Sequence, residues 1–250
     1  MTSNSEPRHA RQLMLREIGG PGQAKLADAT VGVVGAGGLG GPAALLLAAA
    51  GVGTLRIWDD DVVELSNLQR QIQFAETDVG ARKVATLAAR VRDLDSGLRV
   101  EAHDARLGAD AADALAGCDV VLDCTDSFAS RFYVDAASRA LGVPLVSGAA
   151  AGWSAQVGVF NAGPDAPCYR CFVSDAPPDA LDCETVGIVS AVVAAAGSVQ
   201  ALEAIKLVTG AGEPLSGRLW VWDGLSGASR TVSVVRDPDC PGCGPREARS

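Results

Sequence analysis

Histidine, aromatic residues and long apolar runs are scarce in this chain of 250 residues. Two histidines and 4% aromatic residues leave few candidates for catalysis centred on an imidazole ring. No run reaches the roughly 18 consecutive apolar residues of a membrane span. The polar stretch Met1–Arg11 lacks the apolar centre of a secretory signal. We therefore expect a cytoplasmic protein with no membrane partner.

An excess of basic residues is also missing. The chain has 21 Lys and Arg against 30 Asp and Glu, which gives a formal net charge of −9. Because non-specific nucleic-acid binding depends on a basic surface, we expect no nucleic-acid partner. Apolar residues make up 48% of the chain, which is typical of a globular protein with a substantial core.

Strand-like apolar segments alternate with helical segments over the first 150 residues, which predicts βαβ units and a parallel sheet. Later strands instead surround one long helix. We expect one α/β domain at 8–244, between flexible tails at 1–7 and 245–250. Its fold is a Rossmann-like doubly wound sheet that continues into a mixed, partly antiparallel sheet. The expected strands are 30–35, 54–58, 98–103, 119–123, 144–146, 156–161, 219–223 and 230–236, and the expected helices are 39–50, 81–94, 111–116, 128–141 and 188–207.

A glycine-rich loop joins the first strand to the first of these helices. Residues Gly35–Gly40 read G-A-G-G-L-G and match G-x-G-x-x-G in the strand–helix context that gives this pattern its meaning. Such a loop lets the backbone approach phosphates, which the helix N-terminus attracts. Asp59 ends the second strand, where an acid binds ribose hydroxyls. The motif predicts a nucleotide site but leaves NAD, FAD and ATP open.

Four of the seven cysteines form two C-x-x-C pairs, at Cys168–Cys171 and Cys240–Cys243. Two such pairs supply four thiolates for a tetrahedral, structural Zn²⁺ that would join distant segments. A redox dithiol and two unrelated pairs are the alternatives. Cys118 and Cys124 flank an apolar strand, and we expect them to be small buried hydrophobic residues.

Charged residues follow the second strand, in Asp59–Asp61, in Glu64–Gln71 and around Arg82 and Lys83. Cations beside a nucleotide site suit chemistry in which negative charge develops on a leaving pyrophosphate. A nicotinamide enzyme does not need them. From spacing alone, Arg70 and Lys83 are equally consistent with a solvated surface, and we expect Arg82 to be solvated.

Six motifs in order resemble those of the ThiF/MoeB family, the bacterial relatives of the ubiquitin-activating enzymes. The resemblance covers nearly the whole chain, from about Arg8 to Gly244. The motifs are Gly35–Gly40, Ser66–Gln71, Asp123–Asp126, Cys168–Cys171, Gly197–Lys206 and Cys240–Cys243.

The resemblance implies an adenylyltransferase. Such enzymes use Mg-ATP to adenylate the C-terminal Gly-Gly carboxylate of a small ubiquitin-like sulfur carrier protein, and they release pyrophosphate. A separate donor supplies the sulfur. Because a C-terminal carboxylate is already ionised at neutral pH, no general base is needed. The pathway stays open among thiamin, molybdenum cofactor, tRNA thiolation and specialised-metabolite synthesis.

The resemblance also implies residue roles. Asp126 matches the acid that organises Mg²⁺. Arg11 matches a catalytic arginine that reaches the neighbouring subunit's ATP site, which implies a homodimer. Cys183 matches a loop cysteine that some relatives use covalently in sulfur transfer, whereas in others it is a spectator thiol. Ser127 stands where the family often has Asn, a change we expect to be minor. The nucleotide ligands implied are Gly35, Gly37, Gly38, Gly40, Asp59, Ser66, Asn67, Arg70, Lys83 and Asp126, of which Arg70, Lys83 and Asp126 are also catalytic, and the zinc ligands implied are Cys168, Cys171, Cys240 and Cys243.

Two other classes of function remain open. The glycine loop and Asp59 alone would allow an NAD-dependent oxidoreductase, although the chain has no Tyr-x-x-x-Lys pair. The cysteine pairs and the loop together would also allow a zinc-stapled nucleotide-binding module that is not an enzyme. Nucleotide preference and carrier-dependent pyrophosphate exchange would separate the three.

Overall fold

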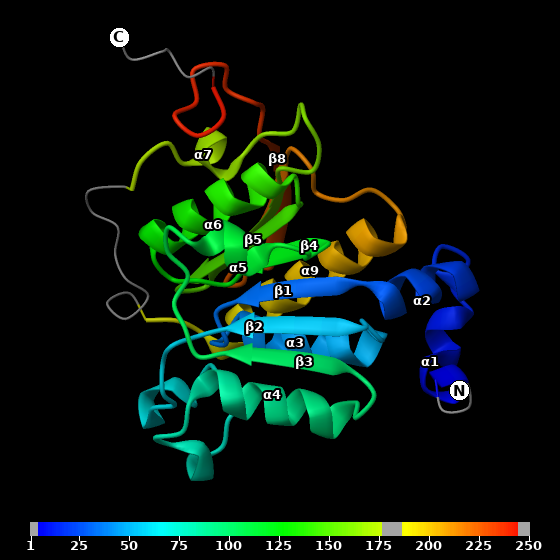
Figure 1. Cartoon of the computed structure of the whole chain (residues 1–250). Coiled ribbons are helices and arrows are strands. Elements are labelled where there is room, and N and C mark those ends of the chain that lie inside the picture. Colours follow the sequence, from blue (N-terminus) through cyan, green and yellow to red (C-terminus); the bar gives the residue numbers. More distant parts are fainter. Residues whose placement is uncertain (1–4, 177–186, 245–250) are drawn as a thin grey trace.

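The computed structural model describes residues 5–176 and 187–244 of the chain. A sheet in the order β3-β2-β1-β4-β5-β6-β7-β8 runs through these residues (Figure 1). Neighbours from β3 to β5 are parallel, and those from β5 to β8 are antiparallel. The strands are β1 (Thr30–Val34), β2 (Thr54–Trp58), β3 (Arg99–His103), β4 (Val120–Asp123), β5 (Leu145–Ala151), β6 (Ser154–Phe160), β7 (Arg218–Asp223) and β8 (Ala228–Ser233).

Helices cover both faces of this sheet (Figure 1). α3, α4 and α9 enclose one hydrophobic core, and α5 and α6 enclose the other. The expected doubly wound arrangement is therefore confirmed. The described helices are α1 (Ser5–Leu13), α2 (Gly19–Asp28), α3 (Gly40–Ala50), α4 (Lys83–Leu94), α5 (Ala111–Leu115), α6 (Phe128–Leu141), α7 (Tyr169–Phe172) and α9 (Ser190–Thr209), with short 3-10 turns η1 (Leu65–Asn67) and η2 (Glu76–Asp78).

The central strands are apolar because both of their faces are covered. In β1, Val31 and Val33 enter the core beneath α3 and α9, whereas Val34 enters the core beneath α5 and α6. Successive side chains of a strand point to opposite faces, so a parallel strand between two helical layers needs a nearly continuous apolar sequence. This explains why β1 and β4 read as unbroken runs.

α9 is the one helix among the described residues that is long and apolar enough to cross a membrane. Its buried polar side chains bond to the rest of the domain. Gln200 donates to the carbonyl oxygens of Asp123 (2.8 Å) and Val146 (3.1 Å), and Glu203 accepts from the Leu215 N–H (2.7 Å). Hydrogen bonding of this kind satisfies buried polar groups in a protein interior. α9 is therefore a core helix of this domain.

Some elements depart from the sequence expectation. β5 continues to Ala151, beyond the expected end at Val146, and pairs along its length with β6. α2 was not expected, since no helix or strand before residue 30 was predicted from the sequence. α1 begins at Ser5, so the expected tail 1–7 is helical from that residue onward.

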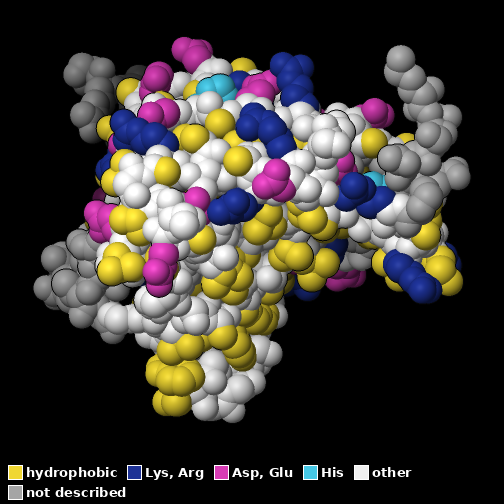
Figure 2. Space-filling view, turned by 90° about the horizontal axis from the view of Figure 1, so that it is seen from below, with side chains coloured by type: hydrophobic (Ala, Val, Ile, Leu, Met, Phe, Trp, Pro, Cys, Tyr) yellow, Lys and Arg dark blue, Asp and Glu magenta, His cyan; other side chains and the backbone are white. Residues whose placement is uncertain are grey.

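Charges of both signs are mixed on the molecular surface. On the face in Figure 2, Lys and Arg side chains stand among Asp and Glu side chains, and hydrophobic side chains gather towards the lower part of the view. Over the described residues, this face therefore shows charges of both signs and no patch of a single sign.

Candidate functional site

The strand order reverses between β1 and β4, and a pocket opens beyond the carboxyl ends of these strands. Open α/β sheets bind ligands at such a reversal, because neighbouring connections leave it in opposite directions. The pocket is lined by Val34, Gly35, Gly37, Gly38, Leu39, Trp58, Asp59, Asp60, Asp61, Arg70, Gln71, Lys83, Ala105, Arg106, Leu107, Cys124, Thr125, Asp126, Ser130, Arg131, Ala149, Ala150, Ile188 and Val193.

The glycine loop forms one wall and leads into α3. Gly35 has φ +99, and an added Cβ there would lie 2.8 Å from the Cys124 carbonyl oxygen. An added Cβ at Gly40 would overlap the Gly35 carbonyl oxygen. Both positions therefore require glycine, one for its backbone angle and the other for close packing. The result is a tight turn that points the α3 N-terminus at the pocket, a geometry suited to phosphate.

Two backbone N–H groups hold the Asp59 side chain at the start of the glycine loop. One carboxylate oxygen accepts from the Ala36 N–H (2.7 Å), and the other accepts from the Asp61 N–H (2.9 Å). Burial raises the pKa of Asp59, and these two N–H bonds oppose that rise only in part. The carboxylate thus has a fixed orientation at the end of β2, where the sequence places a ribose ligand.

Two cations reach the pocket from the segment that follows β2. Lys83 is the first residue of α4, and its buried side chain donates from Nζ to Asp61 Oδ2 (2.9 Å). Arg70 also lines the pocket and donates from Nη1 to the Ser66 carbonyl oxygen (3.2 Å). The structure therefore brings Arg70 and Lys83 to the glycine loop, which spacing alone left undecided.

Other residues expected at the site do not line the pocket. Gly40 packs beneath the loop, and Asn67 is buried in η1, where its Oδ1 accepts from the Glu64 N–H (3.3 Å). Ser66 is exposed and bonds to Glu64 (3.2 Å). Arg11 is exposed on α1, at the amino end of the strands and opposite the pocket (Figure 1). Within a single chain, these residues either pack next to the pocket without lining it or lie far from it.

A buried ionic network holds the loop after β4, which carries Asp126. Arg131 donates to the Thr125 carbonyl oxygen (2.6 Å) and lies 3.6 Å from the buried carboxylate of Asp123. Asp123 in turn accepts from the Thr125 hydroxyl (2.6 Å) and the Ser147 hydroxyl (2.7 Å). The peptide just before Asp126 is thus fixed, while the Asp126 side chain remains exposed at the pocket.

Sequence reasoning missed several polar residues of the pocket region, among them Gln73 and Arg106. Gln73 is buried and donates to the carbonyl oxygens of Ala36 (2.9 Å) and Gly37 (3.0 Å), so it supports the glycine loop from behind. Arg106 lines the pocket from the segment after β3. Its place just beyond a parallel strand was an available signal, whereas nothing in the sequence around Gln73 marks its role.

The two cysteine pairs meet in a separate cluster. Cys168 directly precedes α7, which lies beside the C-terminal loop (Figure 1), and all four sulfur atoms lie within 4.8 Å of one another. The Sγ separations are 3.4 Å between Cys171 and Cys243, 3.5 Å between Cys168 and Cys240, and 3.9 Å between Cys168 and Cys171. Zn–S bonds of about 2.3 Å place tetrahedral sulfur ligands about 3.8 Å apart. The cluster therefore fits one Zn²⁺ and leaves no position for a substrate.

Two of the four thiols in this cluster bind protons tightly when no metal holds them. Burial raises the pKa of Cys168, and it raises the pKa of Cys171 to about 11. At neutral pH a metal must therefore displace protons to bind these two residues.

Of the three remaining cysteines, two lie in the core and one lies outside the described residues. Cys118 and Cys124 are buried, as expected, and Cys124 also borders the nucleotide pocket. Burial raises the pKa of both thiols, which makes them poor nucleophiles. Cys183 lies outside the described residues.

Comparisons with known proteins agree on one family. A model of the ThiF family matches residues 9–242. The sulfur carrier protein ThiS adenylyltransferase of Escherichia coli is 44% identical over 238 residues, which is 95% of this chain and 94% of the relative. The SAMP-activating enzyme E1 of Haloferax volcanii is 42% identical over 240 residues, covering 95% of this chain and 88% of that protein.

A solved structure shares the fold. The crystal structure of E. coli MccB with AMPCPP and MccA matches with a TM-score of 0.84 at 21% identity, over 98% of this chain and 76% of that one. Identity this low supports the fold alone. The family model and the two relatives cover nearly the whole chain at much higher similarity, and this chain belongs to the ThiF family.

Proposed function

We propose that this chain is an ATP-dependent adenylyltransferase that activates the C-terminal Gly-Gly carboxylate of a small ubiquitin-like sulfur carrier protein. One observation carries the proposal: the glycine loop, Asp59, Arg70, Lys83 and Asp126 line a single pocket. The ThiF-family membership and the two named relatives support the choice of reaction.

The pocket has an order that suits ATP. The glycine loop and the α3 N-terminus take the phosphates, and Asp59 accepts the ribose hydroxyls. Lys83 and Arg70 stand on the phosphate side of Asp59, where they neutralise a triphosphate. A nicotinamide dinucleotide would place its pyrophosphate at the same loop but develops no charge there during hydride transfer. The two cations therefore favour ATP over NAD.

The reaction needs positioning and positive charge more than proton transfer. A carboxylate oxygen of the carrier attacks the α-phosphorus of ATP, and the bond from that phosphorus to the bridging oxygen of pyrophosphate breaks. The carrier carboxylate is already ionised at neutral pH, so no base is required. Arg70 and Lys83 stabilise the charge that develops on pyrophosphate, and the fixed loop orients the reacting groups.

Asp126 is our proposed ligand for Mg²⁺. Its exposed carboxylate lines the same pocket as the glycine loop, and Mg²⁺ in such sites binds one or two carboxylates together with substrate phosphates. When bound there, Mg²⁺ would neutralise phosphate charge. The Arg131 contact to the Thr125 carbonyl fixes the backbone next to this ligand.

We further propose a cytoplasmic homodimer in which Arg11 completes the partner's pocket, because Arg11 is exposed and remote from the pocket of its own chain. Subunit mixing tests this. Arg11→Ala and Lys83→Ala variants, each inactive alone, should regain activity when mixed, since one pocket of a mixed dimer is intact. Mixed dimers without recovered activity would contradict the shared site.

A separate donor delivers sulfur after adenylation in this proposal, and the adenylation step itself uses no thiol. Cys183, which lies outside the described residues, is therefore dispensable for it. Its neighbours Asp182 and Glu184 are acidic, and nearby acids raise a thiol pKa rather than activate the thiol. A Cys183→Ala variant should keep pyrophosphate exchange near that of the wild-type protein, and loss of exchange in a folded variant would contradict this.

The direct test of the function is exchange of labelled pyrophosphate into ATP, with and without a carrier protein that ends in Gly-Gly. We expect exchange only with the intact carrier and Mg²⁺, and none with a carrier that lacks its two C-terminal glycines. Titrations with ATP and NAD⁺ complete the test. Binding of NAD⁺ in preference to ATP would favour an oxidoreductase, and ATP binding without exchange would favour a non-enzymatic module.

A further inference from the structure

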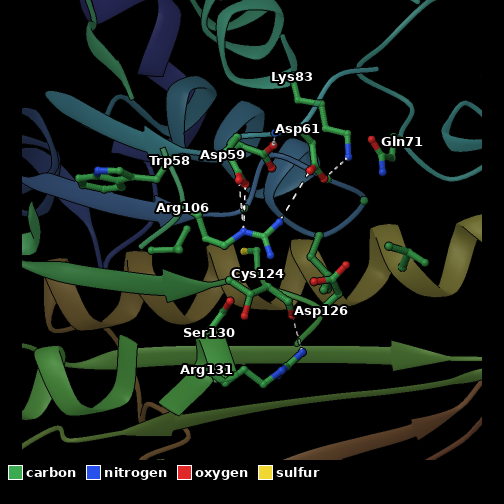
Figure 3. A pocket seen from close by; sticks show the side chains of 18 of the residues that line it. Trp58, Asp59, Asp61, Gln71, Lys83, Arg106, Cys124, Asp126, Ser130 and Arg131 are labelled. Atoms are coloured by element: carbon green, nitrogen blue, oxygen red, sulfur yellow. Dashed lines mark hydrogen bonds and ion pairs between the residues drawn. The ribbon is translucent and has the colours of Figure 1, made fainter. Parts of the chain in front are cut away.

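Arg106 occupies a position in the pocket that the proposed chemistry does not use. Figure 3 shows its guanidinium in the middle of the pocket, with Asp59 and Asp61 on one side and Cys124 and Asp126 on the other. The side chain is 65% exposed, so it is not part of the core. A nucleotide that enters must either displace this group or pack against it.

The pocket geometry places the nucleotide base near Arg106. In Figure 3, Trp58, Asp59, Asp61 and Lys83 follow one another across the pocket. Phosphates belong at the Lys83 end, next to the glycine loop, and the ribose belongs at Asp59. The base must therefore lie beyond Asp59, away from Lys83. That end is lined by Ala105–Leu107 and Trp58, a mainly apolar set that includes one cation.

Acidic neighbours hold the guanidinium across the pocket. Arg106 Nε lies 3.2 and 3.3 Å from the two carboxylate oxygens of Asp60, and Nη2 lies 3.9 Å from Asp61. The hydrogen bond from Arg106 to Asp60 raises the pKa of the guanidinium, so the side chain stays charged. These contacts use one edge of the planar group and leave its flat face available.

We propose that Arg106 stacks on the adenine of bound ATP and supplies a large part of the affinity for the base, with Asp60 holding the guanidinium in place. A planar, weakly hydrated guanidinium packs well on an aromatic ring, which a lysine ammonium cannot imitate. The alternative is that Arg106 is a third phosphate ligand, since its guanidinium also reaches towards Asp61, and the two-ligand experiment below distinguishes these roles. This inference rests on the proposed use of ATP.

Two ligands separate base stacking from phosphate binding. ATP and inorganic tripolyphosphate, each with Mg²⁺, are titrated into the full-length protein and its Arg106→Ala, Arg106→Lys and Asp60→Asn variants. We expect Arg106→Ala to weaken ATP binding about 5- to 20-fold, as loss of a partly desolvated cation–π contact does, and to leave tripolyphosphate binding unchanged. Arg106→Lys should recover little of the loss, and Asp60→Asn should lose part of the affinity.

Arg99 offers a matched control. It is another exposed arginine, at the opposite end of β3, where it pairs with Glu101 at 2.8 Å, and it does not line the pocket. Arg99→Ala should therefore bind both ligands as the wild-type protein does. Because Arg99 and Arg106 are exposed, thermal unfolding should show that both variants fold normally.

Several results would overturn the inference. Wild-type affinity for ATP in Arg106→Ala would remove the stacking role. An equal loss for tripolyphosphate, or full recovery in Arg106→Lys, would make Arg106 a simple electrostatic ligand. Failure of the wild-type protein to bind ATP would overturn this inference and the proposed function together. ATP binding that depends on Arg106, without carrier adenylation, would support the inference and contradict the function alone.

Discussion

Lys83 shows how one side chain is held ready for a charged ligand. Its side chain is only 9% exposed and donates to Asp61, whose own side chain is 51% exposed. Asp61 also lies within ion-pair distance of Arg106. A phosphate that enters the pocket can therefore replace Asp61 as the partner of Lys83. Asp61 would then remain in contact with water and with Arg106.

The first prediction concerns this lysine. Lys83→Ala should lower carrier-dependent pyrophosphate exchange by about 10²-fold, because it removes a preorganised charge at the leaving group. Folding should survive, since Asp61 remains solvated. Arg92→Ala is the control, because Arg92 is exposed near the other end of the same helix. Exchange that persists in Lys83→Ala at the rate of Arg92→Ala would contradict the assigned role.

The second prediction concerns the pH dependence of ATP binding through Asp59. Burial is the main cause of its raised pKa, so this carboxylate takes up a proton at a higher pH than an ordinary aspartate. Protonation reduces its capacity to accept ribose hydroxyls. ATP affinity should therefore fall as the pH is lowered through this raised pKa and recover as the pH rises again.

Asp59→Asn separates this effect from titration of ATP itself. The variant should bind ATP more weakly at neutral pH, and its affinity should lack the part of the pH dependence that Asp59 causes. Phosphate titration affects both proteins alike and cancels in the comparison. Parallel pH profiles for the two proteins would show that Asp59 does not control binding.

The candidate site was predictable where a residue's position along the chain determines its place in the fold. Gly35 and Asp59 directly follow parallel strands, so their convergence follows from topology. The roles of Lys83 and Arg70 were predicted only from the family resemblance. In an irregular loop, the spacing between residues along the chain does not determine where their side chains lie. Gln73 could not be predicted, since its bonds to the glycine loop depend on tertiary packing alone.

At the scale of elements, the sequence predicted the bounds of those strands and helices that the local residue pattern determines. β2 and α6 have the expected bounds, because residues that end regular structure flank both: Gly53 and Asp59–Asp61 flank β2, and Ser127 and Gly142 flank α6. β5 was predicted too short: after Val146 its residues are small, and their strand conformation depends on pairing with β6. α2 depends on tertiary contacts, such as burial of Leu26 and the Lys25 bond to the Thr209 carbonyl oxygen (3.0 Å).

The third prediction concerns the packing of α3 against the glycine loop. In Gly40→Ala, the new Cβ would overlap the Gly35 carbonyl oxygen and force the loop away from α3. We expect a loss of about 1–3 kcal/mol in the free energy of unfolding, as overpacking does, together with weaker ATP binding. Chemical denaturation and nucleotide titration measure the two effects.

Gly20→Ala is the matched glycine control. An added Cβ at Gly20 meets no atom within 4 Å, and this residue also lies in a helix, α2. It should keep or slightly raise stability, because alanine favours helix more than glycine does. Equal behaviour of the two variants would mean that the loop adapts to a larger residue and that its close packing is not required.

At the scale of the whole molecule, the sheet separates a nucleotide site from a structural cluster. The pocket lies where parallel strands reverse their order, whereas the cysteine pairs follow β6 and β8 of the antiparallel part. The sequence predicted the four ligands from two short motifs, although their meeting in space requires the complete fold. A metal at this cluster would join chain segments on either side of α9.

The fourth prediction concerns that metal. Purified protein should contain about one zinc per chain, bound by four thiolates. Removal of zinc should lower the midpoint of thermal unfolding, because metal binding is coupled to folding. Zinc affinity should fall as the pH is lowered, since protons compete for thiols whose pKa burial has raised.

Cys240→Ser and Cys118→Ser separate the metal ligand from an ordinary buried thiol. Cys240→Ser should reduce the zinc content and lower stability, whereas Cys118→Ser should keep full zinc content. Metal-free protein with wild-type stability and exchange would show that the cluster is not a structural zinc site.

The central claim is that this pocket transfers an adenylyl group to a carrier C-terminus. The most direct measurement is intact-mass analysis of the carrier protein after incubation with this protein, ATP and Mg²⁺, with pyrophosphatase present to prevent reversal. The account predicts a carrier heavier by one adenylyl group, formed with wild-type protein and absent with Lys83→Ala. An unmodified carrier, under conditions in which the wild-type protein is folded, dimeric and saturated with ATP, would contradict it.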